Sequence, residues 1–313
     1  MFDAQHRDAL ISLARFDEPA VRWATPMMSS DPGVYVQGVT RGAMDMNVEI
    51  HGDGDKPHLL LVHGLLSSRA QWRPNLEALS TVSTPVVVEL LGHGRSPSPT
   101  AREAYSVAAY VRRFEALRER LGLERWFVCG QSFGAGLTIR YALEHPGRIV
   151  GQVFTNTMSG LSPAARERLP ERMARSDAVA RGGREALKAL PFHPRPSKRL
   201  PSEVWEDLVA DADLLSPPAV AEALRTTSPE LSVAADLGRI SVPTLLVNGT
   251  RESAFQPLRD LAERAIPGLA VVDLDGGHSV NLDQAEAFND AVARFIRRHG
   301  ERRVAGAPQG GHH

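Results

Sequence analysis

The chain has very little cysteine, no long apolar run and no excess of charge of either sign. Cys129 is the only cysteine among 313 residues, so an internal disulfide is impossible and nothing calls for an oxidising compartment. No stretch reaches the ~20 consecutive apolar residues that a membrane-spanning helix needs. The first sixteen residues include Asp3, Arg7 and Asp8 and lack the apolar run of a signal peptide. We therefore expect a cytoplasmic protein that does not enter a membrane.

The balance of charge and hydropathy limits the partners of the protein. The 36 basic and 37 acidic residues leave a formal net charge of −1, so no global field would recruit nucleic acid or anionic lipid. Hydrophobic residues make up 42% and charged residues 23% of the chain, which is typical of a globular domain with a sizeable core. A small, roughly neutral substrate fits this balance better. We expect a monomer or homodimer that binds a small, largely apolar acyl or lactone compound, although the composition does not specify the oligomeric state.

Short apolar runs alternate with helix-compatible stretches along most of the chain. Residues 34–39 and 44–50 alternate apolar and polar side chains, which is typical of an antiparallel edge. The later runs are continuous, which is typical of parallel strands covered on both faces, and they occupy residues 58–62, 85–88, 126–129, 149–154, 244–247 and 269–274. The helix-compatible stretches are residues 105–121, 134–144, 257–266 and 282–298. This pattern predicts an α/β fold with a doubly wound, mostly parallel, eight-stranded sheet.

The alternation fails once, between residues 157 and 238, where helix-like segments and proline-rich joints replace the expected strand. We predict that residues 157–238 form a helical cap inserted into a core made of residues 1–156 and 239–300. Residues 1–30 are predicted to be a helical extension of this core, because Leu10, Leu13, Ala14 and Phe16 are spaced for one face of a helix over residues 4–16. The Gly- and Ala-rich tail, residues 301–313, is predicted to be disordered.

Residues 130–134 read G-Q-S-F-G and match the pattern G-x-S-x-G. An apolar strand leads into this sequence and a helix-compatible stretch leads out, which is the context of a nucleophile elbow. Glycines on both sides allow the sharp turn without Cβ clashes. Such a turn presents Ser132 at the carboxyl end of the sheet, whereas the alternative is a serine that only caps the helix. We predict that Ser132 is a nucleophile.

A serine hydroxyl needs a base to remove its proton, so a histidine on another element is required. His278 lies in the sequence G-G-H-S, in a loop after the apolar strand that ends at Leu274 and before the last helix. An imidazole in this loop can reach over the sheet toward the elbow. His63 follows the strand at residues 58–62, and we interpret it as a residue that shapes that turn. His278 is therefore the predicted base.

The base needs a carboxylate to fix its tautomer and to stabilise the imidazolium. Glu252 follows the strand at residues 244–247, on a loop at the same edge of the sheet. Asn156 ends the preceding strand but carries no charge, while Asp273 and Asp275 are too close to His278 in sequence to approach it easily. Glu252 is the predicted acid, and the alternative for it is a surface salt bridge with a neighbouring arginine.

The chain order Ser132, Glu252, His278 is the order that distinguishes α/β-hydrolases from two other common triad folds. Three further segments resemble that superfamily. They are residues 59–65 (L-L-L-V-H-G-L), similar to its strand and oxyanion loop, residues 89–96 (E-L-L-G-H-G-R-S), similar to its turn D-x-x-G-x-G-x-S, and residues 243–249, similar to the strand before its acid. The chain resembles a capped serine esterase or lactonase of the α/β-hydrolase fold superfamily, over residues 58–156 and 240–299.

The resemblance implies an oxyanion hole made by the backbone N–H groups of Phe133 and Leu65, because the residue after the nucleophile and the one after His-Gly supply it in the family. Two departures from the family pattern concern acids. Glu252 stands where Asp is commoner, so its longer side chain must approach from farther back. Glu89 likewise replaces Asp in the turn at residues 89–96, a change that we expect to concern turn geometry.

A serine at the elbow indicates acyl transfer through an acyl-enzyme, whereas an aspartate there would indicate haloalkane or epoxide opening. We expect a carboxylic ester or a lactone as substrate; amide, thioester and C–C bond cleavage of a β-diketone-like compound remain open. Leu66, Met158, Phe192 and Trp205 are candidates for the substrate pocket. A non-catalytic ligand-binding protein on a hydrolase fold is the alternative from another class.

The remaining polar and reactive residues have structural interpretations. The histidines show neither H-E-x-x-H nor another ligand spacing, so we expect neither a metal nor a cofactor. Cys129 is predicted to be a small core residue, and His93 and Arg95 are predicted to shape the loop in which they lie. Ser67, Ser68 and Arg69 border the oxyanion loop, while Arg195, Lys198 and Arg199 are interpreted as a solvated cluster of the cap.

Overall fold

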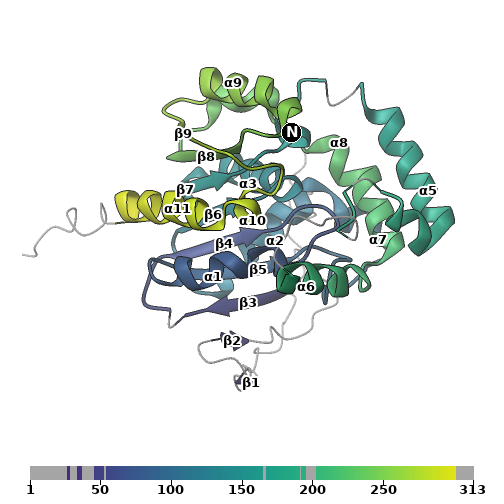
Figure 1. Cartoon of the computed structure of the whole chain (residues 1–313), viewed down its shortest axis with the longest axis horizontal. Helices are drawn as coiled ribbons and strands as arrows, with labels where there is room; N and C mark the ends of the chain where they lie inside the picture. Colours follow the sequence, from purple (N-terminus) through teal and green to yellow (C-terminus); the bar gives the residue numbers. More distant parts are fainter. Residues whose placement is uncertain are drawn as a thin grey trace, which may run out of the picture.

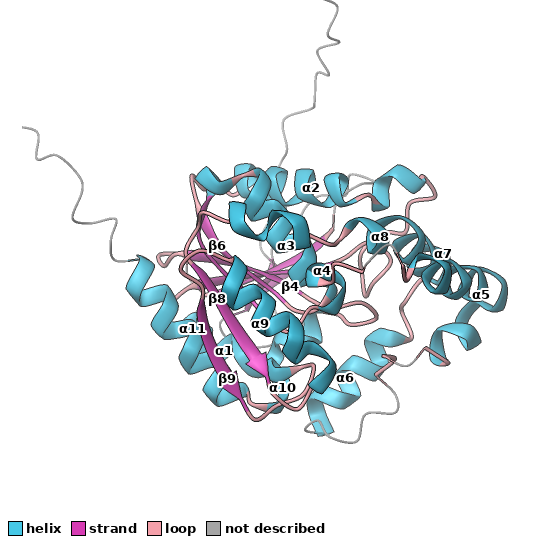
Figure 2. Ribbon diagram, turned by 90° about the horizontal axis from the view of Figure 1, so that it is seen from above, coloured by secondary structure: helices cyan, strands magenta, loops and turns pink. Residues whose placement is uncertain are grey.

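A computed structural model of the chain shows a central sheet between layers of helices (Figures 1 and 2). The structure describes residues 46–300 except 53, 165–166, 191 and 195–201, together with the backbone of the short strands β1 (Met27–Met28) and β2 (Val34–Val36). The predicted helix at residues 4–16, the tail at 301–313 and the basic cluster of Arg195, Lys198 and Arg199 lie outside the described residues. The described part of the predicted helical extension, Met27–Met28, is a strand.

The sheet has the strand order β1-β2-β3-β5-β4-β6-β7-β8-β9. Strands β1, β2 and β3 pair antiparallel with their neighbours, including β3 with β5, and all other pairs are parallel. The remaining strands are β3 (Asn47–His51), β4 (His58–Val62), β5 (Thr84–Glu89), β6 (Trp126–Gly130), β7 (Ile149–Phe154), β8 (Thr244–Gly249) and β9 (Ala270–Leu274). The predicted α/β class, the mostly parallel sheet and the antiparallel edge are confirmed, and β1 makes nine strands where eight were predicted.

Helices cover both faces of the sheet (Figure 2). One face carries α2 (Val107–Arg120), α3 (Phe133–Glu144) and α9 (Gln256–Ala265). The opposite face carries α1 (Arg73–Ser80) and α11 (Ala285–Gly300). The predicted helices match α2, α3, α9 and α11, whereas α1 was not predicted and the short helix α10 (Val280–Asp283) precedes α11.

The continuous apolar runs in the central strands follow from this two-sided covering. In β4, Leu60 and Val62 join the hydrophobic cluster beneath α2 and α3, while Leu59 and Leu61 join the cluster beneath α1 and α11. All four side chains are fully buried. Because successive side chains of a strand point to opposite faces, burial of both faces requires apolar residues at every position. Each such leucine or valine contributes about 2 kcal/mol of burial free energy.

A helical segment connects β7 to β8 over the carboxyl ends of the central strands. Leu66, from the loop after β4, belongs to the hydrophobic cluster of this segment, and Ala219 approaches Gly92 in the loop after β5. Its elements are α4 (Met158–Leu161), α5 (Leu169–Lys188), α6 (Ser202–Ala212), α7 (Pro217–Glu222), the π-helical turn Ala223–Thr227, α8 (Ser228–Glu230) and the 3₁₀ turn Ala234–Arg239. The function of residues 157–238 as a separate cap stays a prediction.

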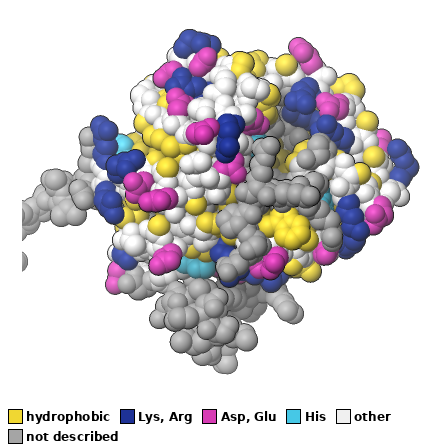
Figure 3. Space-filling model, in the orientation of Figure 1, with side chains coloured by type: hydrophobic (Ala, Val, Ile, Leu, Met, Phe, Trp, Pro, Cys, Tyr) yellow, Lys and Arg dark blue, Asp and Glu magenta, His cyan; other side chains and the backbone are white. Residues whose placement is uncertain are grey.

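The surface carries charges of both signs. On the face drawn in Figure 3, lysine and arginine side chains alternate with aspartate and glutamate rather than gathering by sign, in keeping with the net charge of −1. None of the helices in the described ranges is both long enough and apolar enough to cross a membrane.

Candidate active site

Ser132 lies in a sharp turn between β6 and α3, with φ 52° and ψ −111°. A residue other than glycine in such a conformation stores about 1–3 kcal/mol of strain. The flanking glycines make the turn possible: a Cβ at Gly130 would lie 2.5 Å from the Cα of Ala135, and one at Gly134 would lie 2.3 Å from the carbonyl oxygen of Val62. The Ser132 side chain makes no capping hydrogen bond to α3, so its hydroxyl is available to another partner.

The structure brings the three side chains predicted from the sequence into contact. The Ser132 hydroxyl Oγ lies 2.9 Å from Nε2 of His278, and Nδ1 of the same ring lies 2.9 Å and 3.0 Å from the two carboxylate oxygens of Glu252. Because an ionised carboxylate only accepts, Nδ1 of His278 carries the proton and donates to Glu252. Nε2 of the neutral ring then accepts from the hydroxyl. This is the arrangement in which an imidazole can remove the serine proton.

Glu252 is held in place by the end of the neighbouring strand. The Asn156 amide Nδ2 donates to Glu252 Oε2 at 2.8 Å, and the same side chain bonds both backbone groups of Gly249. The other acids considered lie elsewhere: Asp273 pairs with Arg259, and Asp275 lies 3.6 Å from the guanidinium of Arg251. The longer glutamate side chain therefore reaches His278 while Asn156 fixes its second oxygen.

The loop after β4 and the start of α3 lie beside Ser132, since a Cβ at Gly64 would lie 3.4 Å from the Cβ of Ser132 and Ser132 directly precedes α3. Phe133 is the first residue of α3, so its N–H has no partner within the helix. Leu65 precedes Leu66, which has φ 61° and donates its N–H to Nε2 of His93 at 3.2 Å. Among the hydrogen bonds of the described residues, none uses the N–H of Leu65 or Phe133. Both amides are thus free to donate to an oxygen, and their assignment as an oxyanion hole stays a prediction.

Comparison with protein families adds a second observation. The model of the α/β-hydrolase fold matches residues 57–285, which is more than half of the chain. The chain belongs to the α/β-hydrolase family. The match includes residues 59–65, 89–96 and 243–249, and it confirms the resemblance drawn from these three segments.

The relatives of this α/β-hydrolase carry several different names. A protein provisionally named carbamate hydrolase RutD, from Caulobacter sp. (strain K31), is 30% identical over 258 residues, covering 79% of this chain and 94% of the relative. Carboxylesterase YbfK from Bacillus subtilis (strain 168) is 27% identical over 258 residues, covering 78% and 82%. The structure of MenH from S. aureus has a TM-score of 0.71 at 19% identity, covering 81% and 98%, and shows the shared fold. A hydrolase on this fold is supported, while the substrate differs among the relatives.

The four residues predicted to line a substrate pocket have different surroundings in this α/β-hydrolase. Leu66 is buried in the hydrophobic cluster of the helical segment, and Met158 is half-buried against the core beneath α2 and α3. Phe192 is 39% exposed and lies under the guanidinium of Arg175. Trp205 is half-buried, and its indole Nε1 has no hydrogen-bond partner among the described residues. Their function as pocket residues stays a prediction.

Sequence reasoning missed Gln131 as a residue that joins the elbow to the histidine loop. The Gln131 amide Nε2 donates to the backbone carbonyl of His278 at 3.1 Å, across 147 residues of sequence. Its backbone N–H donates to the carbonyl of Val62 at the end of β4. Its place immediately before the nucleophile was the one sequence signal, but nothing in the pattern G-x-S-x-G specifies that residue's partner.

His63 and His93 shape the loops in which they lie, as predicted from the sequence. Nδ1 of His63 donates to the Gly64 carbonyl at 2.7 Å, and its Nε2 accepts from the Leu90 N–H at 3.0 Å. Nδ1 of His93 donates to the Leu91 carbonyl at 3.0 Å. Both rings are fully buried and lie 5.2 Å apart. Each neutral ring thus joins two backbone segments. Among the described residues, no cluster of three or more His, Cys, Asp or Glu side chains could hold a metal ion.

These two histidines predict a loss of stability in mild acid. Burial lowers the pKa of His63 to about 3 and that of His93 to about 4, from an ordinary value of 6.5. The unfolded chain binds protons below pH 6.5 while the folded rings stay neutral, so the free energy of unfolding falls as the pH falls through this window. The expected loss by about pH 5 is about 2 kcal/mol for each ring.

Urea unfolding at pH 7 and pH 5 measures this loss, and NMR of the imidazole ring protons shows the protonation state directly. Both rings should remain neutral in the folded protein at pH 5. An unchanged free energy of unfolding, or a ring that titrates near its ordinary pKa in the folded state, would contradict the prediction.

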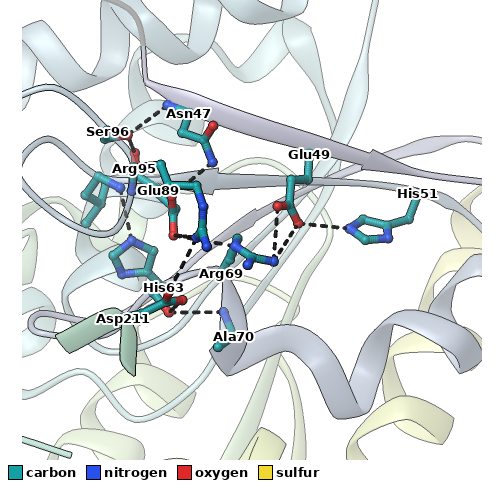
Figure 4. A network of polar contacts seen from close by, with 12 residues as sticks. Asn47, Glu49, His51, His63, Arg69, Ala70, Glu89, Arg95, Ser96 and Asp211 are labelled. Atoms are coloured by element: carbon teal, nitrogen blue, oxygen red, sulfur yellow. Dashed lines mark hydrogen bonds and ion pairs between the residues drawn. The ribbon is translucent and has the colours of Figure 1, made fainter. Parts of the chain in front are cut away.

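Glu89, the second departure from the family pattern, shapes a turn. Its carboxylate Oε2 accepts from the Arg95 N–H at 2.8 Å and from the Asn47 amide at 2.9 Å, and burial raises its pKa. A Cβ at Gly94 would lie 2.0 Å from its other oxygen. Ser96 donates to the Glu89 carbonyl at 2.5 Å. The turn after β5 is therefore built around this buried acid (Figure 4).

Proposed function

We propose that this protein is a serine hydrolase that cleaves a carboxylic ester or a lactone through an acyl-enzyme. The observation that carries the proposal is the position of the His278 ring, which hydrogen-bonds Ser132 on one side and Glu252 on the other at about the same distance of 2.9 Å. An alcohol, an imidazole and a carboxylate in this order form the group that activates a serine for attack on a carbonyl.

In the first half of the proposed reaction, Ser132 Oγ attacks the carbonyl carbon while Nε2 of His278 takes the hydroxyl proton. The electron pair of the C=O bond moves to the oxygen, where the N–H groups of Phe133 and Leu65 stabilise it. Each such donor is worth about 3 kcal/mol in the transition state. The bond to the leaving alcohol then breaks, and His278 gives the alcohol its proton, which leaves the acyl group on Ser132.

In the second half, water attacks the acyl carbon and His278 removes its proton as a base. The His278 side chain is 42% exposed and the Glu252 side chain is 20% exposed, so the ring faces solvent on one side while its acid is largely shielded. Glu252 holds Nδ1 protonated and stabilises the imidazolium formed in each half-reaction. Collapse of the second tetrahedral intermediate releases the acid and restores Ser132.

The substrate proposed is a medium-sized, largely apolar acyl compound or lactone, held against Met158, Phe192 and Trp205. A carbamate is the second candidate, because relatives at about 30% identity are provisionally named carbamate hydrolases and a carbamate carbonyl can undergo the same attack. Thioester and β-diketone cleavage on the same three residues remain alternatives. We propose that the helical segment at residues 157–238 acts as the cap that decides among them.

The proposed substrate class predicts a dependence on acyl length. Hydrolysis of p-nitrophenyl esters from acetate to decanoate is expected to show kcat/KM rising by about tenfold from acetate to a medium chain, since each buried CH₂ contributes up to about 0.8 kcal/mol. Initial rates at matched enzyme concentration, with lactone, thioester and carbamate substrates in parallel, measure it.

A preference for acetate alone would contradict the apolar pocket but not the acyl-enzyme. Absence of turnover for every substrate, together with no labelling of Ser132 by a fluorophosphonate probe, would favour the non-catalytic alternative of a ligand-binding protein on this fold.

A further inference from the structure

The loop at residues 64–68, which carries Leu65, is held by side chains from three separate parts of the chain. The Gly64 N–H donates to Oε1 of Gln71 at 3.1 Å, and the Leu66 N–H donates to His93. Both of these partners come from loops or helices of the core. The third partner is Asp211 on α6, in the helical segment, which lies 143 residues from the loop in sequence.

The contact with Asp211 is made by Ser68. Its hydroxyl donates to Asp211 Oδ2 at 2.7 Å and accepts from the Ala70 N–H at 3.1 Å, where it caps the 3₁₀ turn Arg69–Trp72. Ser68 is 1% exposed and Asp211 is 6% exposed. A hydrogen bond to a buried carboxylate is about twice as strong as one between neutral groups. The Ser68 hydroxyl therefore uses its single proton in the hydrogen bond to Asp211 of α6.

Positive charge faces the same carboxylate from the turn after β5. Arg95 Nη1 lies 3.4 Å from Asp211 Oδ1 and 3.9 Å from the buried carboxylate of Glu89. Figure 4 shows four charged side chains that converge. They are Asp211 of α6, Arg95 of the turn after β5, Glu89 at the end of β5 and Arg69 of the 3₁₀ turn Arg69–Trp72. Asp211 thus balances charge in a network that joins the helical segment to both loops at the carboxyl end of the sheet.

The loop needs such support because its backbone is strained. Leu66 has φ 61°, a conformation that costs about 1 kcal/mol or more for a residue with a side chain and persists only where the surroundings over-determine it. The direction of the Leu65 N–H depends on this backbone, since it lies one residue before the strained position.

We propose that Asp211 is a positioning residue, which fixes the loop at residues 64–68 through Ser68 and thereby aims the Leu65 N–H at the reacting carbonyl. The proposal rests on the proposed function, because in that function the Leu65 N–H donates to the oxyanion. It assigns to the helical segment a share in assembling the oxyanion hole, besides enclosing substrate.

Four variants test the proposal: Asp211→Ala, Asp211→Asn, Ser68→Ala and the double variant Ser68→Ala/Asp211→Ala. Asp211→Ala is expected to lower kcat for a p-nitrophenyl ester by about tenfold with KM changed by less than about twofold, because a misdirected donor weakens the transition state and not substrate binding. Asp211→Asn keeps an oxygen that accepts from Ser68, so it should recover most of the lost kcat.

The matched control is Asp207→Ala. Asp207 lies one turn earlier on the same helix and pairs at the surface with Arg73, its side chain 42% exposed. Removing it loosens the docking of α6 without touching Ser68, so kcat should stay within about twofold of wild type. If Asp211→Ala matches Asp207→Ala in kcat, or lowers activity only through KM, the proposal is overturned.

The double variant decides whether Asp211 acts through Ser68. The two single losses in kcat should not multiply in the double variant, since both changes remove the same hydrogen bond between Ser68 and Asp211. Multiplying effects would show two independent roles and overturn the proposal. Should Asp211→Ala fail to fold, Ser68→Ala decides the question. It should lower kcat by about tenfold with KM nearly unchanged, and a kcat within about twofold of wild type would overturn the proposal.

Amide hydrogen exchange at residues 64–68 provides a readout without turnover. Exchange should be faster in Asp211→Ala than in Asp207→Ala, and equal rates would overturn the proposal even if the wild type hydrolyses esters. If the wild type hydrolyses no substrate while exchange in Asp211→Ala is faster, the proposed function fails and the loop contact stands.

Discussion

Ser132→Ala is expected to lower kcat for ester hydrolysis by more than about 10⁴-fold, because removal of the nucleophile leaves only the oxyanion donors and substrate binding. The strained φ of 52° at residue 132 is tolerated by alanine about as well as by serine, so the variant should fold. Steady-state rates of wild type and variant, and loss of fluorophosphonate labelling in the variant, measure the effect.

Ser253→Ala is the matched control for this variant. Ser253 is exposed and follows Glu252 at the start of the 3₁₀ turn Ser253–Phe255, so its replacement should leave kcat within about twofold of wild type. Labelling that persists in Ser132→Ala would locate the reactive serine elsewhere and refute the assignment.

Glu252→Gln is expected to lower kcat by about 10³- to 10⁴-fold. A glutamine amide can donate to Nδ1 of His278, and the ring proton then moves to Nε2, which faces Ser132 at 2.9 Å. A protonated Nε2 cannot accept the hydroxyl proton. The Asn156 amide, which donates to Glu252 Oε2 at 2.8 Å, would donate to the single oxygen of the glutamine amide and so turn its NH2 group toward the ring. Single-turnover rates with a p-nitrophenyl ester isolate the acylation step that this tautomer blocks.

Asp273→Asn and Asp275→Asn are controls that test the identity of the acid. Both carboxylates are engaged with arginines away from the His278 ring, so each variant should retain kcat within about threefold of wild type. Full activity in Glu252→Gln together with a large loss in either aspartate variant would transfer the acid's role to that aspartate.

The sequence predicted the central strands well because burial on both faces leaves a plain signal, uninterrupted apolar residues. It did not predict α1, since part of the buried face of that helix is polar. Asn75 is fully buried and hydrogen-bonds Asn281 and Asn289, more than 200 residues along the chain. A buried amide satisfied by distant partners resembles a surface residue when only its neighbours in sequence are seen.

The last predicted helix, at residues 282–298, lies in the right place, but the structure has two helices there, α10 and α11. Gln284, with φ −134° and ψ 49°, separates α10 from α11. Before it, the carboxylate of Asp283 accepts from the Gly277 N–H at 2.7 Å and so ends the loop that carries His278. The break between α10 and α11 therefore follows a residue that holds the histidine loop. Such a contact depends on the tertiary structure, so helical periodicity in the sequence does not predict it.

The contact among Ser132, Glu252 and His278 could be predicted because each of them follows a strand of the same sheet, and the carboxyl ends of parallel strands meet at one edge. The contacts of Gln131 with His278 and of Ser68 with Asp211 were not foreseen, since they join polar residues 147 and 143 positions apart. Such pairs depend on how the helical segment and the histidine loop dock onto the core, and no local pattern encodes that docking.

The position of Leu66 limits how the helical segment can be exchanged between relatives of this protein. It belongs by sequence to the loop after β4, yet its side chain completes the apolar interior formed by Val179, Leu187 and Val220 of the helical segment. A chimaera that received residues 157–238 from another member would inherit either a void or an overfilled interior at this point. Exchanging the helical segment between relatives therefore requires transplanting the tip of that loop together with the helices.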